Sequence, residues 1–171
     1  MSASHTPGPN NSFLETKIPP PAVMASCALL AWLTHQLFPF ALLTTSDQSW
    51  PLTNTLALLI FAIGLSTDLV SLKRFFSAKT TINPLKPQKA SHLVTSGIYR
   101  FTRNPMYVGL MLWLVALAVY LNNPLCLIWP LVFSAYITRF QILPEEKFLK
   151  ELFGEEYLAY LQSTPRWLFF K

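Results

Sequence analysis

The chain has 171 residues, of which 52% are hydrophobic and 12% are charged, and its mean hydropathy is positive. Soluble domains carry about 25% charged residues, so this composition excludes an ordinary soluble domain and favours a single unit in a membrane. The net charge of +5 does not indicate a nucleic-acid-binding protein, because seven of the thirteen Lys and Arg are clustered between Lys73 and Arg103 instead of covering a polar surface interleaved with aromatic residues.

The N-terminal part predicts a tail followed by two membrane-spanning helices. Residues 1–20 are rich in Ser, Pro and Asn and have no apolar period, so we expect a mobile tail. Pro21 to Leu43 is a run of 23 residues without a formal charge, enough to cross the hydrocarbon layer of about 30 Å as a helix. Leu52 to Leu72 is a second apolar run, and its only charge is Asp68. Residues 21–72 therefore predict two transmembrane helices.

Two shorter apolar runs predict a helical hairpin. Pro105 to Leu121 and Pro124 to Thr138 have 17 and 15 residues, and Asn122-Asn123 joins them. Such lengths span a bilayer only marginally, so we expect a tight hairpin that is tilted or partly sunk against the first two helices. The predicted fold class is all-α integral membrane, with about four transmembrane helices including this hairpin.

The segment after the hairpin predicts an interfacial C-terminal helix. Its apolar residues recur at helical spacing at Phe148, Leu149, Leu152 and Phe153. Pro144 suits the first turn of this helix, and Gly154 suits a break or a cap.

The distribution of positive charge predicts the orientation in the membrane. The Lys73 to Arg103 loop should stay in the cytoplasm, which places both termini and the C-terminal helix on the same side. The membrane can be a bacterial inner membrane or the endoplasmic reticulum, and the sequence carries no signature of an oligomeric state.

The sequence lacks the motifs of the metal, hydrolase and nucleotide-binding sites that are common in soluble enzymes. The three histidines are far apart and there is no HExxH or paired CxxC, so we expect no metal site. The chain has no GxSxG, P-loop or GxGxxG, and its five glycines exclude a soluble nucleotide-binding fold. Cys27 and Cys126 lie in apolar runs, which makes a disulfide framework improbable.

Two polar clusters flank the predicted hairpin, at residues 92–107 and 139–146. A hairpin brings its two ends together, so we expect the clusters to meet at the membrane boundary. The residues expected to approach one another are Arg103, Asn104 and Tyr107 on one side and Glu145 and Glu146 on the other. Such a group suits a pocket that accepts a polar cofactor from water and a lipid-like substrate from the bilayer.

Each of these residues also has a simpler interpretation. Arg103 can be a positive-inside anchor, and Tyr107 can be an interfacial or packing aromatic residue. Glu145 and Glu146 can favour a helix N-terminus through its dipole. Asp68 is interpreted as a satisfied residue at the end of its helix.

Two blocks, HLVTSGIYRFTRNPMYVG and, after the hydrophobic hairpin, PEEKFLKELFGEEYLAYLQSTPR, resemble the isoprenylcysteine carboxyl methyltransferase family and the related phospholipid methyltransferases. The family pattern is G-x-Y-x-x-x-R-[HN]-P-x-Y-x-G, then a Glu-Glu pair, then F-G-x-x-Y-x-x-Y. The matching residues are Gly97, Tyr99, Arg103, Asn104, Pro105, Tyr107 and Gly109, followed by Glu145, Glu146, Phe153, Gly154, Tyr157 and Tyr160. The resemblance implies that residues 73–171 form a methyltransferase core.

The resemblance further implies S-adenosylmethionine as the methyl donor and a lipophilic methyl acceptor. The cofactor-binding residues that it implies are His92, Val94, Gly97, Tyr99, Arg103, Asn104 and Tyr107. Glu145 and Glu146 would face the reacting centre. Arg103 or Arg139 could hold the acceptor's carboxylate or the cofactor's own carboxylate through paired donors.

The leading hypothesis is a methyltransferase that O-methylates an isoprenylcysteine-type carboxylate. The alternatives are N-methylation of a phospholipid or a small amine and a non-catalytic membrane scaffold. A carboxylate acceptor needs no general base, whereas an amine acceptor must lose a proton, for which Glu145 or Glu146 is the candidate acceptor. A non-catalytic membrane scaffold is the alternative from another class, with its basic loop bound to anionic headgroups.

Overall fold

The structure is a computed structural model, and it describes residues 18–41, 52–77 and 93–168. These residues form helices and no strand, which confirms the all-α prediction for this part of the chain. The elements are α1 (Pro20–Leu37), α2 (Leu52–Ser77), the 3-10 helix η2 (Gly97–Arg100), α3 (Pro105–Tyr120), the 3-10 helix η3 (Pro124–Leu127), α4 (Ile128–Ile137), the π-helix η4 (Thr138–Ile142) and α5 (Leu143–Ser163). Most of the predicted 1–20 tail lies outside the described residues.

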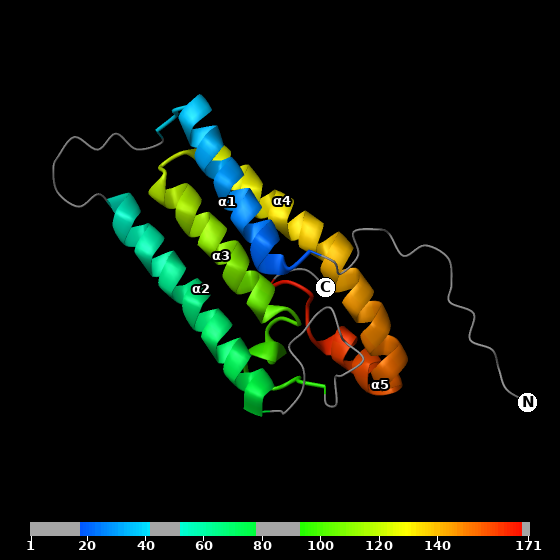
Figure 1. Ribbon diagram of the computed structural model, residues 1–171. Helices are drawn as coiled ribbons and strands as arrows, with labels where there is room; N and C mark the ends of the chain where they lie inside the picture. Colours follow the sequence, from blue (N-terminus) through cyan, green and yellow to red (C-terminus); the bar gives the residue numbers. More distant parts are fainter. Residues whose placement is uncertain (1–17, 42–51, 78–92, 169–171) are drawn as a thin grey trace, which may run out of the picture.

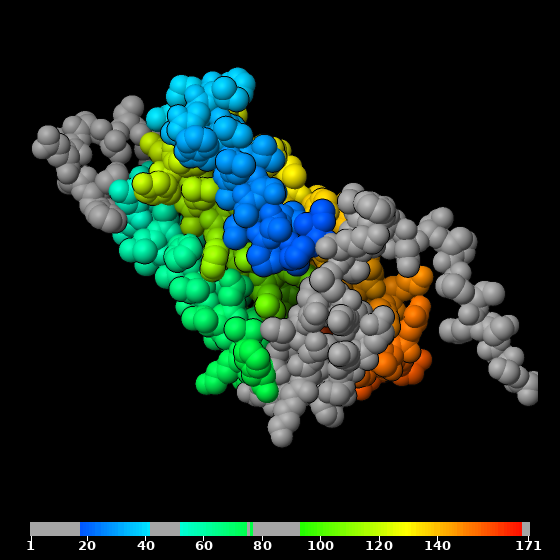
Figure 2. Space-filling view, in the orientation of Figure 1, coloured from blue at the N-terminus to red at the C-terminus, as the bar shows by residue number. Residues whose placement is uncertain are grey.

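The helices α1, α2, α3 and α4 run in alternate directions along the bundle, and α5 continues from α4 (Figure 1). α3 is the central helix and packs against α1, α2 and α4. The space-filling view shows α1 and α2 on the outside, with part of α3 visible between them (Figure 2). The end of α2, the start of α3 and the start of α5 therefore lie toward the same end of the bundle, as the hairpin prediction requires.

α1 is shorter than the predicted run from Pro21 to Leu43. It ends at Leu37, and the Phe38 backbone leaves the helical region with φ −129° and ψ 74°. Pro39 explains this end, because the residue before a proline is disfavoured in the helical conformation. The apolar run was therefore longer than the helix that it contains.

Two helical stretches of the described residues are long and apolar enough to cross a membrane, Leu52–Arg74 and Pro124–Ser163. The helix Pro105–Tyr120 is apolar but shorter, in agreement with the prediction for the first arm of the hairpin. Length and composition thus support two spans, and the count of four remains a prediction. α2 continues to Ser77, beyond its predicted end at Leu72.

Asn123 ties the hairpin turn to the end of α1. Its side-chain oxygen accepts a hydrogen bond from the Leu125 backbone N–H at 3.0 Å, and its Nδ2 donates to the Phe38 carbonyl at 2.8 Å. Cys126 is buried beside the same helix, where its thiol donates to the Ala31 carbonyl at 3.2 Å. Both cysteines are free thiols, which confirms that prediction.

Two glycines allow α2 and α3 to pack closely. A Cβ atom on Gly64 would lie 2.7 Å from Trp113 Cδ1, and one on Gly109 would overlap the Asp68 carboxyl group. Asp68 Oδ1 is buried at this contact without a hydrogen-bond partner among the described residues. The interpretation of Asp68 as a satisfied helix-end residue is therefore wrong for this oxygen.

The predicted boundary between the hairpin and the C-terminal helix is also wrong. The chain stays helical from α4 through η4 into α5, and Ile142 has helical angles of φ −66° and ψ −48°. Pro144 lies in the first turn of α5, as predicted, and follows a π-helical turn that accommodates a residue without a backbone N–H. Placement of α5 in the membrane interface remains a prediction.

Gly154 breaks α5, as predicted. Its φ of 51° and ψ of −124° are outside the helical region and are favoured only by glycine. After this break the chain turns back toward the centre of the bundle (Figure 1). Tyr160 is thereby buried, and its hydroxyl donates to the Tyr99 carbonyl at 2.7 Å.

Candidate active site

An Arg–Glu–Arg cluster lies at the base of the hairpin. Arg103 precedes α3, Glu146 belongs to the first turn of α5, and Arg166 follows the end of α5. Arg103 Nη2 donates to Glu146 Oε1 at 2.8 Å, while Arg166 Nε and Nη2 donate to the two oxygens of the same carboxylate at 2.9 and 2.8 Å. The Arg103 and Glu146 side chains are 5% and 6% exposed, so each charge depends on the other for solvation.

The preceding residue of α5, Glu145, forms a second side-chain pair, with Tyr107 of α3. The Tyr107 hydroxyl donates to Glu145 Oε1 at 2.8 Å, and Tyr107 is buried in the first turn of α3. Within the described residues, the hydrogen-bond partner of Glu145 is therefore a neutral phenol, whereas Glu146 is paired with two guanidinium groups. Two adjacent carboxylates thus have different electrostatic environments.

The C-terminal segment, residues 164–167, closes over the chain that enters α3. The Arg103 backbone N–H donates to the Pro165 carbonyl at 2.9 Å, and Arg103 Nη1 donates to the Thr164 carbonyl. The Arg166 carbonyl accepts bonds from Thr102 Oγ1 at 2.9 Å and from Asn104 Nδ2 at 3.0 Å. These bonds fix the C-terminal segment against residues 102–104, so that it forms one wall of the site.

Burial and the Glu146 carboxylate determine the protonation states of Arg166 in this wall and of Tyr99 in η2. Hydrogen bonds to the Glu146 carboxylate raise the pKa of the Arg166 guanidinium, so this group stays charged. Burial raises the pKa of the Tyr99 hydroxyl, which therefore stays neutral near pH 7. The site therefore combines the positive groups of Arg103 and Arg166 with the neutral phenol of Tyr107. It also contains Glu145, a carboxylate that is not paired with an arginine of the described chain.

The structure confirms that the two predicted clusters meet. Arg103 contacts Glu146, and Tyr107 contacts Glu145, both at 2.8 Å. The simpler interpretation of Glu145 and Glu146, as residues that favour a free helix N-terminus, is wrong because η4 continues into α5 without such an end.

The other predicted cofactor residues have different positions. Asn104 holds the C-terminal segment, and Tyr99 is buried in η2 with its carbonyl bound by Tyr160. Gly97 opens η2 with a φ of +66°, and Val94 is half-buried just before it. His92 lies outside the described residues. Roles for all of these residues remain predictions.

Three residues of the site were not predicted. Arg166 binds Glu146, Thr102 binds the Arg166 carbonyl, and the Trp167 indole N–H donates to Thr138 Oγ1 at 3.0 Å. The proline-arginine step that follows α5 was the only sequence signal for Arg166, and it gave no indication of a partner.

The model of a known protein family matches the part of the chain that contains most of these residues. Residues 52–156 match the model of the phospholipid methyltransferase family. This match includes both carboxylates, Arg103 and Tyr107, and it ends before Arg166.

Curated relatives have related names. The chain is 31% identical over 142 residues to protein-S-isoprenylcysteine O-methyltransferase A of Arabidopsis thaliana, which covers 80% of this chain and 69% of the relative. It is 35% identical over 89 residues to protein-S-isoprenylcysteine O-methyltransferase B of the same plant, covering 50% of this chain and 44% of the relative. The mouse protein-S-isoprenylcysteine O-methyltransferase is 36% identical over 96 residues, covering 53% of this chain and 33% of the relative. Two of these three matches span less than half of the relative.

Proposed function

Because this chain belongs to the phospholipid methyltransferase family, we propose that it is an integral membrane methyltransferase that uses S-adenosylmethionine and acts on a lipophilic acceptor. The acceptor that we favour is an isoprenylcysteine-type carboxylate, which becomes a methyl ester. The proposal rests on two adjacent carboxylates of α5 at the base of an apolar hairpin. Glu145 is bound by Tyr107, and Glu146 is bound by Arg103 and Arg166. The exposed Arg74 and Arg100 support a cytoplasmic position for this end of the bundle.

The residues of the site fit this methyl donor, which is positive at sulfur and carries its own carboxylate. Glu145 can face a positive charge, since its partner within the described residues is the neutral Tyr107. Arg103 Nε is buried without a partner among the described residues, and it can donate to a carboxylate. We propose that Glu145, Tyr107 and Arg103 hold the donor, together with the backbone around Gly97 and Tyr99.

The chain's own residues then have separate tasks. When bound, S-adenosylmethionine supplies an electrophilic methyl group, and its transfer to a carboxylate depends on alignment and on exclusion of water. Arg103 and Arg166 fix Glu146 and the C-terminal segment as a wall of the site. Tyr107 orients the Glu145 carboxylate toward the reacting centre. No residue has to accept a proton for this reaction.

N-methylation of a phospholipid or a small amine is the second candidate, and the description of the matching family favours it. An amine acceptor must release a proton, and Glu145 is the carboxylate with the free capacity to take it.

The chemical stability of the product distinguishes the two reactions. Membranes that contain the protein are incubated with methyl-labelled S-adenosylmethionine and N-acetyl-S-farnesyl-L-cysteine, and the extracted product is treated with base. We expect the label to be released as methanol, because a methyl ester is hydrolysed by base. A base-stable label in a phospholipid or amine would identify the second candidate, and an absence of label from every lipophilic product would contradict both.

A further inference from the structure

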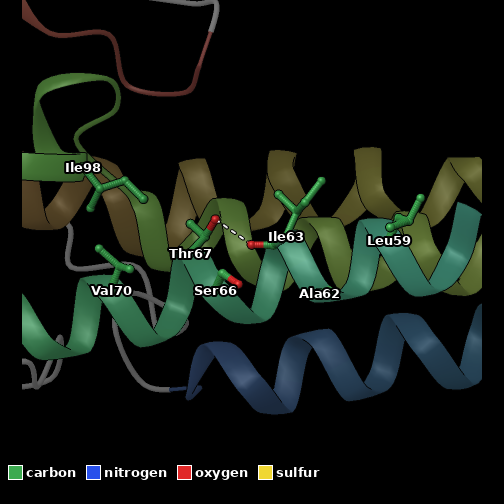
Figure 3. A pocket seen from close by; sticks show the side chains of 7 residues that line it. All are labelled: Leu59, Ala62, Ile63, Ser66, Thr67, Val70 and Ile98. Atoms are coloured by element: carbon green, nitrogen blue, oxygen red, sulfur yellow. Dashed lines mark hydrogen bonds between the residues drawn. The ribbon is translucent and has the colours of Figure 1, made fainter.

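An apolar hollow of about 380 Å³ lies along the outer side of α2 (Figure 3). Its lining consists of Ile98 of η2 and six residues of α2, which are Leu59, Ala62, Ile63, Ser66, Thr67 and Val70. The Thr67 hydroxyl donates to the Ile63 carbonyl at 2.8 Å, so this hydroxyl is already paired. We call this hollow the α2 groove, and its lining suits a hydrocarbon chain.

The α2 groove ends at a positive charge. Its lining residues Ile63, Thr67 and Val70 follow helical spacing, and the next position on the same side of α2 is Arg74. The Arg74 guanidinium lies on Gly97, because a Cβ atom there would be 2.7 Å from Arg74 Nε and 3.0 Å from Nη2. Gly97 directly precedes Ile98, so the open α2 groove and a cation meet at η2.

The same end of the groove adjoins the candidate active site. Ile98 is followed by the buried Tyr99, which interacts by a side-chain hydrogen bond with Ser71 of α2 and accepts the Tyr160 hydroxyl at its carbonyl. Ser71 is itself buried one residue beyond Val70 of the groove. Tyr99 thus lies between the groove and the two carboxylates, Glu145 and Glu146.

We propose that the α2 groove holds the hydrocarbon chain of the methyl acceptor and that Arg74 binds the carboxylate of the same molecule. This inference rests on the proposed function and makes it more specific. An acceptor with an anionic end complements Arg74, whereas a cationic amine at the same place would be repelled. Arg74 and the α2 residues of the groove, which lie outside the recognised sequence blocks, would therefore help to select a carboxylate acceptor with one long chain.

A binding experiment without any methyl donor tests the chain-binding part of the proposal. The full chain is placed in phosphatidylcholine nanodiscs, and its affinity for radiolabelled N-acetyl-S-farnesyl-L-cysteine is measured. Ile63→Trp fills the groove and should weaken binding about tenfold, or about 1.4 kcal/mol, because the larger side chain occupies the space of the hydrocarbon chain. Leu69→Trp is the matched control, because Leu69 is 57% exposed against 59% for Ile63 and does not line the groove.

A charge-matched pair of probes tests Arg74. Arg74→Gln should weaken binding of the carboxylate probe about fivefold, as expected for a partly exposed ion pair, and should leave the binding of its carboxamide analogue unchanged. Lys150→Gln changes an exposed cation on α5 and should alter neither affinity.

The outcomes separate this proposal from its alternatives. Equal effects of Ile63→Trp and Leu69→Trp, or equal effects of Arg74→Gln on both probes, would overturn it. Displacement of the probe by phosphatidylglycerol in an Arg74-dependent manner would identify the groove as a site for an anionic membrane lipid and would also overturn it. Binding of S-adenosylhomocysteine should be the same in Ile63→Trp and Leu69→Trp as in wild type, so its absence from wild type would count against the proposed function and not against the groove.

Discussion

Replacement of Glu146 by alanine is expected to produce the largest loss of stability, lowering the free energy of unfolding by about 3 kcal/mol. Removal of the carboxylate leaves Arg103, whose side chain is 5% exposed, without its counter-charge and also frees Arg166 from two hydrogen bonds. The midpoint of thermal unfolding in detergent should fall by about 6–12 °C for a chain of this size. The C-terminal segment should also lose its protection from amide hydrogen exchange.

Glu156→Ala provides the control for this measurement, because Glu156 lies on the same helix and is exposed. Its midpoint should differ little from that of wild type, as surface substitutions usually have small effects. A Glu146→Ala midpoint equal to that of Glu156→Ala would show that the Arg–Glu–Arg cluster does not stabilise the fold.

The second large effect is expected on turnover, with Glu145→Gln lowering kcat/KM about 100-fold, or ~2.7 kcal/mol in transition-state stabilisation. The amide keeps the size of the side chain and an oxygen that can accept the Tyr107 hydroxyl, so the change removes chiefly the ability to carry a negative charge or to take a proton. Methyl-transfer rates to the farnesylated probe give the turnover, and thermal unfolding should give a midpoint close to that of wild type.

Glu155→Gln is the matched control, since it makes the same chemical change at an exposed position of α5. Its rate should equal that of wild type. Unchanged turnover in Glu145→Gln would show that this carboxylate does not act at the reacting centre.

The meeting of the two polar clusters was predictable because it follows from connectivity alone. Two apolar runs joined by Asn122-Asn123 have to fold back, and whatever flanks them lies at the same end of the bundle. The prediction of Arg103 beside Glu146 needed no side-chain detail. The pairing of Tyr107 with Glu145 follows from the same return of the chain.

Other features depend on interactions that leave little pattern in the sequence. Arg166 reaches Glu146 only because Gly154 reverses the chain and because backbone carbonyls at residues 164–166 are bound by Thr102 and Arg103. Backbone acceptors have no residue-type signature, so the C-terminal wall could not be predicted. The continuous helix through η4 was missed for a different reason, since Pro144 usually marks a helix start and here follows a π-helical turn.

The central claim is that the base of the hairpin binds the methyl donor, and calorimetric titration of the purified protein with S-adenosylhomocysteine tests it most directly. We expect saturable heat with one molecule bound per chain, and a weaker affinity for Arg103→Ala than for wild type at a temperature where both are folded. Wild-type protein that remains folded and shows no binding at any accessible concentration would contradict the account.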